Sequence, residues 1–194
     1  MTAPDGDALR SAFVLVTGNA NKAKEAERIL GFRPDTEPVD LPELQSLDLQ
    51  VVLDAKAKEA WSRLERPVVV EETAFYLDSM NGFPGPLVKW MLGAVGPEGL
   101  AHTALALGDP GAMAVCALAY CDGGRLVSAR GETRGHLVAE PRGGAGFGWD
   151  PVFVPEGHTR TYAELEPELK DTLGHRGRAW RAFRGALVDA GIVD

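Results

Sequence analysis

Two groups of polar residues directly follow apolar, strand-like runs in this sequence. The first group is Thr17, Gly18, Asn19 and Lys22, which follows the run from Phe13 to Val16. Gly18 permits a tight turn, and Asn19 can cap a following helix whose free N–H groups then face an anion. This pattern indicates a phosphate-binding turn, although an ordinary strand-turn-helix unit is the commoner explanation for such a segment taken alone. The glycine spacing of a Walker loop is absent.

Lys22 shares the apolar stripe of the helix predicted over residues 20–31. At about 100° per residue, this stripe also carries Ala26, Ile29 and Leu30. Glu25 and Glu27 are expected on other faces. A lysine on the inward stripe at the first turn of a helix is expected to reach past the strand ends into a cleft.

The second polar group is Glu71, Glu72 and Thr73, which follows the β-branched run from Val68 to Val70. Adjacent carboxylates beside a core are unfavourable unless a cation or hydrogen bonds compensate them. Magnesium binds few carboxylates and completes its coordination with waters and substrate phosphates, and a second carboxylate can orient or deprotonate a water. Ligands bind at the carboxyl ends of strands in open α/β sheets, so the two groups together suit a metal-bound phosphate ester. A solvated acidic turn is the alternative.

The composition indicates one domain. The 194 residues are 45% hydrophobic, enough for a sizeable core, and no repeat or linker divides them. We expect a single domain over 1–194, with a flexible segment over 1–10. That segment has no secretory signal and no apolar run is long enough to span a membrane, so we expect a cytoplasmic protein. The net charge of -8 argues against a nucleic acid polymer as partner but not against a nucleotide.

Hydrophobic periodicity and turn signals predict strands alternating with helices, followed by a hairpin. Helices are expected over 20–31, 51–64, 87–92 and 97–107, and strands near 37–39 and over 112–120, 125–132 and 136–139. Cys116 and Cys121 fall on opposite faces of one strand, too far apart for a disulfide. Surface or packing roles are expected for His102, His136 and His158.

A glycine-rich loop with aromatic residues occurs over Gly144–Pro151. Its small residues let a flat ligand approach, and Phe147 or Trp149 can stack on that ligand, although a tryptophan is more often a core residue. On the predicted final helix, the inward stripe carries Arg176, Trp180, Phe183 and Leu187. Arg178 and Arg181 are expected to face solvent.

Six motifs together resemble the inosine triphosphate pyrophosphatase family. They are Thr17–Lys22, Asp40–Glu43, Val70–Thr73, Gly82–Trp90, Phe147–Pro151 and His175–Arg176. Each motif is weak alone, but they occur in the family's order and span nearly the whole chain. The resemblance implies an elongated α/β fold with a long twisted mixed sheet, a substrate groove between two lobes, and a homodimer. It also implies hydrolysis of the non-standard purine nucleoside triphosphates ITP, dITP and XTP to monophosphate and pyrophosphate, which cleanses the nucleotide pool.

The resemblance also implies roles for individual residues. The triphosphate contacts are Thr17, Asn19, Lys22, Lys89 and Lys170. The magnesium-binding acids, for which manganese is an alternative metal, are Glu43 and Glu72, and the catalytic group is Glu71, Glu72 and Lys22. In the base pocket, Phe147 stacks on the purine, Trp149 and Asp150 shape the pocket, and His175 and Arg176 donate to the 6-oxo group. Water then attacks the α-phosphorus.

Two residues depart from the family pattern. Most relatives carry aspartate at the position of Glu72, and many carry serine at that of Gly174. Glutamate keeps the charge but moves the carboxylate outward by one methylene, which a tight octahedral metal site does not absorb without a shift. Three functions therefore remain open: a house-cleaning hydrolase, a pyrophosphatase retuned to another nucleotide in a specialised pathway, and a weakly catalytic nucleotide-binding module.

Overall fold

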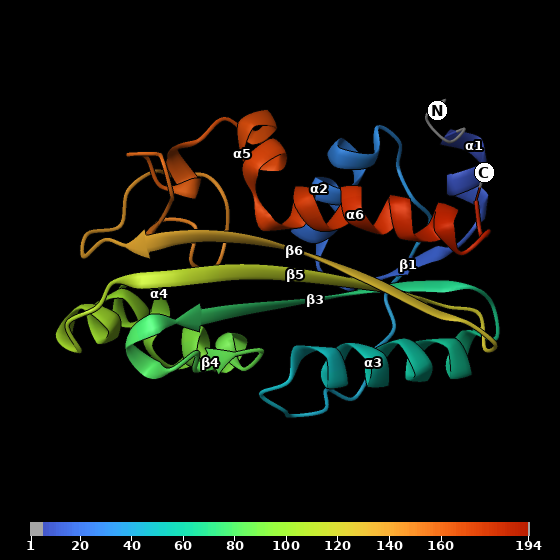
Figure 1. Ribbon diagram of the computed structural model, residues 1–194, viewed down its shortest axis with the longest axis horizontal. Helices are drawn as coiled ribbons and strands as arrows, with labels where there is room; N and C mark the ends of the chain where they lie inside the picture. The colour runs from blue at the N-terminus through green and yellow to red at the C-terminus, as the bar shows by residue number, and fades with distance from the viewer. Residues whose placement is uncertain (1–5, 194) are drawn as a thin grey trace.

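Strand β3 (Val68–Leu77) is a central strand of the sheet in the computed structural model of this protein, which describes residues 6–193. The other strands are β1 (Val14–Val16), β2 (Thr36–Glu37), β4 (Pro84–Gly85), β5 (Gly111–Cys121), β6 (Leu126–Leu137) and β7 (Phe153–Pro155). The sheet order is β2-β1-β3-β5-β6-β7, and β4 pairs with β3 off this path. β3 is parallel to β1 and antiparallel to β5, so the sheet is mixed. The elongated α/β fold expected from the sequence is confirmed (Figure 1).

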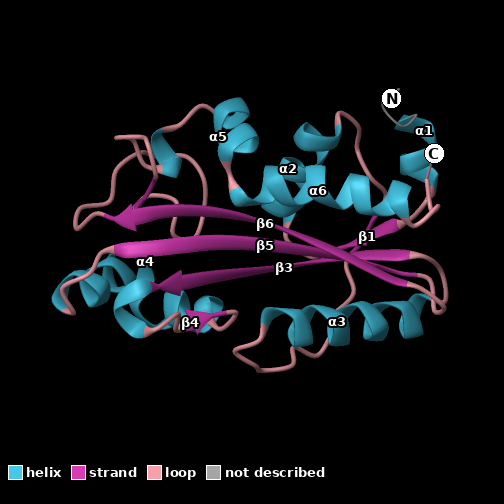
Figure 2. Ribbon diagram, viewed as in Figure 1, coloured by secondary structure: helices cyan, strands magenta, loops and turns pink. Residues whose placement is uncertain are grey.

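Helices lie on both sides of the strands, with α2, α5 and α6 on one side and α3 and α4 on the other (Figure 2). The helices are α1 (Gly6–Ser11), α2 (Ala20–Leu30), α3 (Leu49–Leu64), α4 (Val88–Ala106), α5 (Pro167–Leu173) and α6 (His175–Asp189), with 3-10 turns η1 (Asp78–Met80) and η2 (Tyr162–Glu164). Helix α3 begins before the predicted residue 51 because the Asp48 side chain accepts from the N–H groups of Gln50 and Val51 and caps it.

The acidic pair Glu71 and Glu72 lies inside β3, not in a turn at its end as the sequence predicted. Continuous pairing with β5 carries the strand on to Leu77, whose side chain is buried. Successive residues of a strand point to opposite faces, so the two carboxylates face opposite sides of the sheet. Cations meet them on both sides, and this explains how two charges are tolerated in the middle of a central strand.

One edge of β3 is open between two short partners. β1 ends at Val16, which lies opposite Val70, and β4 pairs only with Phe75 and Tyr76. Within residues 6–193, no strand pairs with residues 71–74 on this edge, while β5 pairs with the same residues on the other edge. The end of β1 and the middle of β3 therefore open at one place.

The two ends of β3 pack into separate parts of the core. Phe75 and Leu77 belong to a cluster that includes residues of α4, whereas Val69 and Val68 belong to two clusters beneath α6 and α3. The open edge lies between these ends. This arrangement agrees with the groove between two lobes that the family resemblance implies.

Several smaller expectations can be compared with the structure. Helix α4 is kinked at Gly96, whose φ of 67° is outside the helical region, so the two helices predicted there are two arms of one bent helix. The strands predicted over 125–132 and 136–139 form one strand, β6.

The N-terminal segment was expected to be flexible over residues 1–10, and residues 1–5 lie outside the described residues. From Gly6 the chain is helical and Leu9 is buried, and the flexibility of residues 6–10 stays a prediction.

The predicted roles of the cysteines and three histidines are confirmed. Cys116 and Cys121 are free and buried in core clusters on opposite faces of β5. His102, His136 and His158 are exposed. No helix among residues 6–193 has the length and apolar character that crossing a membrane requires.

Candidate active site

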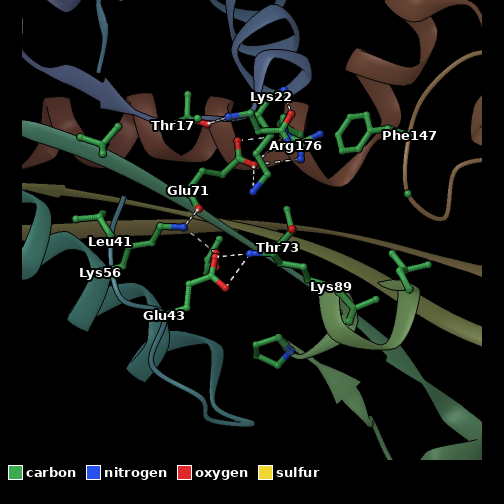
Figure 3. A pocket seen from close by; sticks show the side chains of 18 of the residues that line it. Thr17, Lys22, Leu41, Glu43, Lys56, Glu71, Thr73, Lys89, Phe147 and Arg176 are labelled. Carbon is green, nitrogen blue, oxygen red and sulfur yellow. Dashed lines mark hydrogen bonds and ion pairs between the residues drawn. The ribbon is translucent and has the colours of Figure 1, made fainter. Parts of the chain in front are cut away.

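A cleft of about 710 Å³ opens at the free edge of β3 (Figure 3). Its walls come from the loops at residues 17–19, 39–43 and 147–150, from the middle of β3, and from the beginnings of α2, α4 and α6. The predicted site residues that line it are Thr17, Asn19, Lys22, Glu43, Glu71, Glu72, Lys89, Phe147, Trp149, Asp150, His175 and Arg176. Of the predicted residues, Lys170 alone is not part of this lining. The fold thus gathers residues from both ends of the sequence around one cavity.

The turn before α2 has the cap predicted from the sequence. The Asn19 side chain accepts from the backbone N–H groups of Asn21 and Lys22, at 3.0 and 3.3 Å, and Thr17 Oγ1 accepts from the N–H of Asn19 at 3.1 Å. These contacts fix the helix N-terminus at the cleft. Gly18 has no positive φ and a Cβ there would meet nothing within 4 Å, so the turn itself does not require glycine.

Glu71 faces the side of the sheet that α2 and α6 cover. Its carboxylate accepts from Nε and Nη2 of Arg176, each at 3.1 Å, and lies 3.3 Å from Lys22 Nζ. Burial raises the pKa of the Glu71 carboxyl, but Arg176 and Lys22 outweigh that effect and lower it below its usual value. Lys22 therefore faces inward as the helical stripe predicted, and it meets a carboxylate there.

Glu72 and Glu43 lie on the other side of the cleft, each with one lysine partner. Lys56 Nζ donates to Glu72 Oε2 at 3.1 Å and to the backbone carbonyl of Glu71 at 3.2 Å. Lys89 Nζ donates to both oxygens of Glu43, at 2.8 and 3.0 Å, and the hydrogen bond from Lys89 lowers the pKa of Glu43. Figure 3 shows Glu43, Lys56 and Lys89 directed toward the same region beneath β3.

The loop of residues 147–150 forms the opposite end of the cleft. The Phe147 ring is partly exposed and lies 5.6 Å from the Arg176 guanidinium and 5.3 Å from Lys170 Nζ. The Trp149 ring is 8% exposed and packs 4.7 Å from Phe75, between centroids. Trp149 is thus both a core residue, as its type suggested, and part of the cleft wall.

Lys170 lies behind this loop and not on the cleft surface. It is 8% exposed and donates to Asp150 Oδ2 at 2.7 Å and to Glu25 Oε1 at 2.9 Å. Asp150 Oδ2 also accepts from the Phe147 N–H at 2.8 Å. Burial raises the pKa of Asp150, with Lys170 opposing that shift. In this structure Lys170 supports the loop that carries Phe147, and its predicted triphosphate contact stays a prediction.

Glu25 and Lys56 are site residues that the sequence reasoning missed. Glu25 was expected away from the inward stripe of α2, but it is 6% exposed and bound by Arg176 Nη1 and by Lys170. Burial raises the pKa of Glu25, and these two cations together lower it. Lys56 was one of several charges on a predicted amphipathic helix. No local pattern marks either residue, because their partners lie far away in the sequence.

His175 begins α6 and lies beside two aromatic rings. Its ring centroid is 6.0 Å from that of Trp149 and 5.9 Å from that of Tyr162. Neither ring nitrogen has a hydrogen-bond partner among the described residues. Burial lowers the pKa of His175 well below its usual value, and Arg176, Lys170 and Lys22 lower it further. The imidazole is therefore neutral at pH 7, with one donor and one acceptor available to a ligand.

Neutral His175 predicts a loss of stability in mild acid. The unfolded chain takes up a proton at this histidine near pH 6.5 and the folded protein does not, so this contribution is present in full above that pH. Below it, the free energy of unfolding should fall by at most about 1.4 kcal/mol per pH unit. Urea unfolding at several pH values should show this slope. His175→Gln should flatten it, and His102→Gln, on the surface of α4, should leave it unchanged.

Gly174, one of the departures from the family pattern, immediately precedes α6. Its backbone N–H donates to the carbonyl of Lys170 at 2.8 Å, and a Cβ at this position would lie only 2.5 Å from that oxygen. Glycine thus permits a close approach that a serine would disturb. The connection between α5 and α6 therefore leaves no room for a side chain at position 174.

Curated proteins resemble this chain along most of its length. An inosine triphosphate pyrophosphatase of Batrachochytrium dendrobatidis is 44% identical over 170 residues, which is 86% of this chain and 88% of that protein. One of Candida glabrata is 41% identical over 183 residues, which is 89% of this chain and 95% of that protein.

Solved structures share the fold. A HAM1 protein from Coxiella burnetii has a TM-score of 0.79 at 25% identity, and the match covers 91% of this chain and 98% of that one. A nucleoside-triphosphatase, described as a dITP/XTP pyrophosphatase, from Mycobacterium abscessus has a TM-score of 0.66 at 31% identity, covering 87% and 97%. A sequence model of the Ham1 family matches residues 13–186. The chain therefore belongs to the Ham1 family.

Proposed function

We propose that this protein hydrolyses non-standard purine nucleoside triphosphates, ITP, dITP and XTP, to the nucleoside monophosphate and pyrophosphate. The observation that carries this function is the division of one cleft into two chemically different ends. Lys22, Lys56 and Lys89 each lie beside a carboxylate of the lining, and at the opposite end the partly exposed Phe147 ring lies 5.6 Å from the Arg176 guanidinium. Lysines suit a triphosphate, and an aromatic ring with hydrogen-bonding groups suits a base.

The donor set suits a divalent metal held between Glu43 and Glu72. Each carboxylate lines the cleft, has a single lysine partner and keeps more exposed surface than Glu71. Among residues 6–193, no three or more acidic, histidine or cysteine side chains are grouped closely enough to hold a metal unaided. Two carboxylates suit magnesium, or manganese, whose remaining positions would go to water and substrate phosphates. When bound, the metal would supply charge neutralisation and a more acidic water.

Side chains of the protein bind the phosphates and accept the proton of the attacking water. Lys22 and Lys89 donate to phosphate oxygens and stabilise the charge that develops on pyrophosphate. Glu72 accepts the proton of the water that attacks the α-phosphorus, and the bond between that phosphorus and the bridging oxygen breaks. The lysines exchange their present carboxylate partners for phosphate as the substrate enters.

Base choice follows from the donors at the far end of the cleft. Hypoxanthine presents an acceptor at O6 and a donor at N1, and adenine presents the reverse. Arg176 has only donors, and neutral His175 offers one donor and one acceptor. Arg176 therefore complements the O6 acceptor of a 6-oxo purine and opposes a 6-amino group, whereas neutral His175 can pair with either. The homodimer remains a prediction that rests on the family resemblance, and the cytoplasmic location remains a prediction from the sequence.

Product analysis tests the proposed function. The protein incubated with ITP or XTP should release pyrophosphate and monophosphate only when Mg²⁺ or Mn²⁺ is present. Pyrophosphate and orthophosphate should be measured separately across a panel of nucleoside triphosphates. Orthophosphate as the primary product would contradict the proposal. A strong preference for a nucleotide without a 6-oxo purine would instead support the retuned pyrophosphatase, for which the structural fit of Gly174 is the supporting observation.

A further inference from the structure

Glu71 lies between the two ends of the cleft and is bound to a cation from each. On one side it accepts from Nε and Nη2 of Arg176 at 3.1 Å. On the other it lies 3.3 Å from Lys22 Nζ. Arg176 belongs to the first turn of α6 and lies beside the Phe147 ring, and Lys22 belongs to the first turn of α2. Figure 3 shows the Glu71 side chain rising from β3 toward both.

The neighbouring Glu72 has a different environment. The Glu71 side chain is 3% exposed, and both of its oxygens accept hydrogen bonds from arginine. The Glu72 side chain is 15% exposed and has one lysine partner. A carboxylate whose two oxygens both accept from cationic side chains in the protein interior has little freedom to move toward a water in the cleft. Of the adjacent acids, Glu72 is the one available for chemistry at the phosphate.

We propose that Glu71 is a positioning residue that holds base-reading Arg176 and phosphate-binding Lys22 at a fixed separation, and that it does not serve as a metal ligand or as the base for water. This inference rests on the proposed function and refines the catalytic role that the family resemblance implied for Glu71. Because β5 pairs with β3 at this point, the backbone of Glu71 is fixed. Its carboxylate therefore ties α2 and α6 to the rigid centre of the sheet.

If Glu71 is a positioning residue, the selection of the base depends on it. With Glu71 in place, the guanidinium of Arg176 is held by Glu71 on one side and by Glu25 Oε2 on the other. A neutral side chain at position 71 would leave Arg176 free to turn toward Glu25, and the base would lose a fixed donor. The preference for ITP over ATP should fall accordingly. A base or metal ligand, in contrast, would serve all triphosphates equally.

Ligand binding without metal tests this inference separately from catalysis. The dissociation constant of inosine 5′-monophosphate should be measured by calorimetry for the wild type, Glu71→Gln and the matched variant Glu72→Gln. Glu71→Gln should weaken binding about tenfold, the size expected when a charged hydrogen bond is lost, and Glu72→Gln should leave it within about twofold. In steady-state assays with Mg²⁺, the ratio of kcat/KM for ITP to that for ATP should fall in Glu71→Gln and stay unchanged in Glu72→Gln.

Glu71→Asp provides a second variant in case Glu71→Gln does not fold. Aspartate keeps the charge, but its shorter side chain reaches only one of the two cations, so binding should weaken to a smaller extent. The inference is overturned if either folded Glu71 variant binds inosine 5′-monophosphate like the wild type and loses kcat equally for ITP and ATP. Failure of the proposed function would be visible in the wild type alone, as orthophosphate release.

Discussion

Glu72→Gln is expected to lower kcat for ITP by roughly a thousandfold, which corresponds to about 4 kcal/mol of activation free energy. The glutamine side chain has the same size but can neither neutralise a divalent metal nor accept a proton from water. Lys56 would donate to an amide oxygen in place of the carboxylate and would keep its hydrogen bond to the backbone carbonyl of Glu71, so the fold should persist. Steady-state measurement of pyrophosphate release provides kcat.

Glu72→Asp is the informative companion to this variant. Aspartate restores the side chain that most of the family carries, so kcat should stay the same or rise if the longer glutamate strains the metal geometry. Glu98→Gln, at an exposed position of α4, should have wild-type activity and serves as the control. Wild-type kcat in Glu72→Gln would remove Glu72 from the mechanism.

The sequence predicted the elements best where one periodicity dominates. The inward stripe of α6 placed Arg176 with Trp180, Phe183 and Leu187, and all four side chains are buried. The predicted end of β3 is wrong because two charged residues followed by a threonine are typical of a turn. Whether a strand continues through such residues depends on cations from α2, α3 and α6, and local sequence carries no information about those distant partners.

The same reason limits what could be predicted of the site. Its surface groups were found through six motifs, and the structure places all of them on one cleft. Lys170, a predicted contact outside those motifs, does not line it. The buried charges behind that surface were not found. Glu25 appears on a helical wheel as one more surface acid, yet it binds two cations that lie 145 and 151 residues further along the chain. Only the tertiary fold converts such residues into partners.

Arg176 shows how these buried charges change the design of an experiment. Arg176 is 4% exposed, and its guanidinium pairs with the carboxylates of Glu71 and Glu25. Removing the side chain would leave two buried carboxylates with fewer partners, a loss on the order of 3–5 kcal/mol against a usual total stability of 5–15 kcal/mol. Arg176→Ala should therefore unfold at a clearly lower temperature. Any activity loss in that variant mixes base recognition with stability.

Arg176→Lys separates the two effects and should lower kcat/KM for ITP about a hundredfold, and that for ATP far less. Lysine keeps the charge that Glu71 and Glu25 require, but it cannot present the planar set of donors that arginine offers to a 6-oxo group. A buried donor or acceptor left unpaired costs roughly 1–3 kcal/mol, so the gap between kcat/KM for ITP and kcat/KM for ATP should narrow by one to two orders of magnitude.

Steady-state kinetics with both nucleotides measure this gap, at a temperature where thermal unfolding shows that the variant is folded. Arg178→Lys, on the exposed face of the same helix, is the matched control and should leave the gap unchanged. An equal loss of kcat/KM with ITP and with ATP would assign Arg176 to phosphate binding or to structure. Only a group that contacts the base can distinguish two substrates that differ in the base alone.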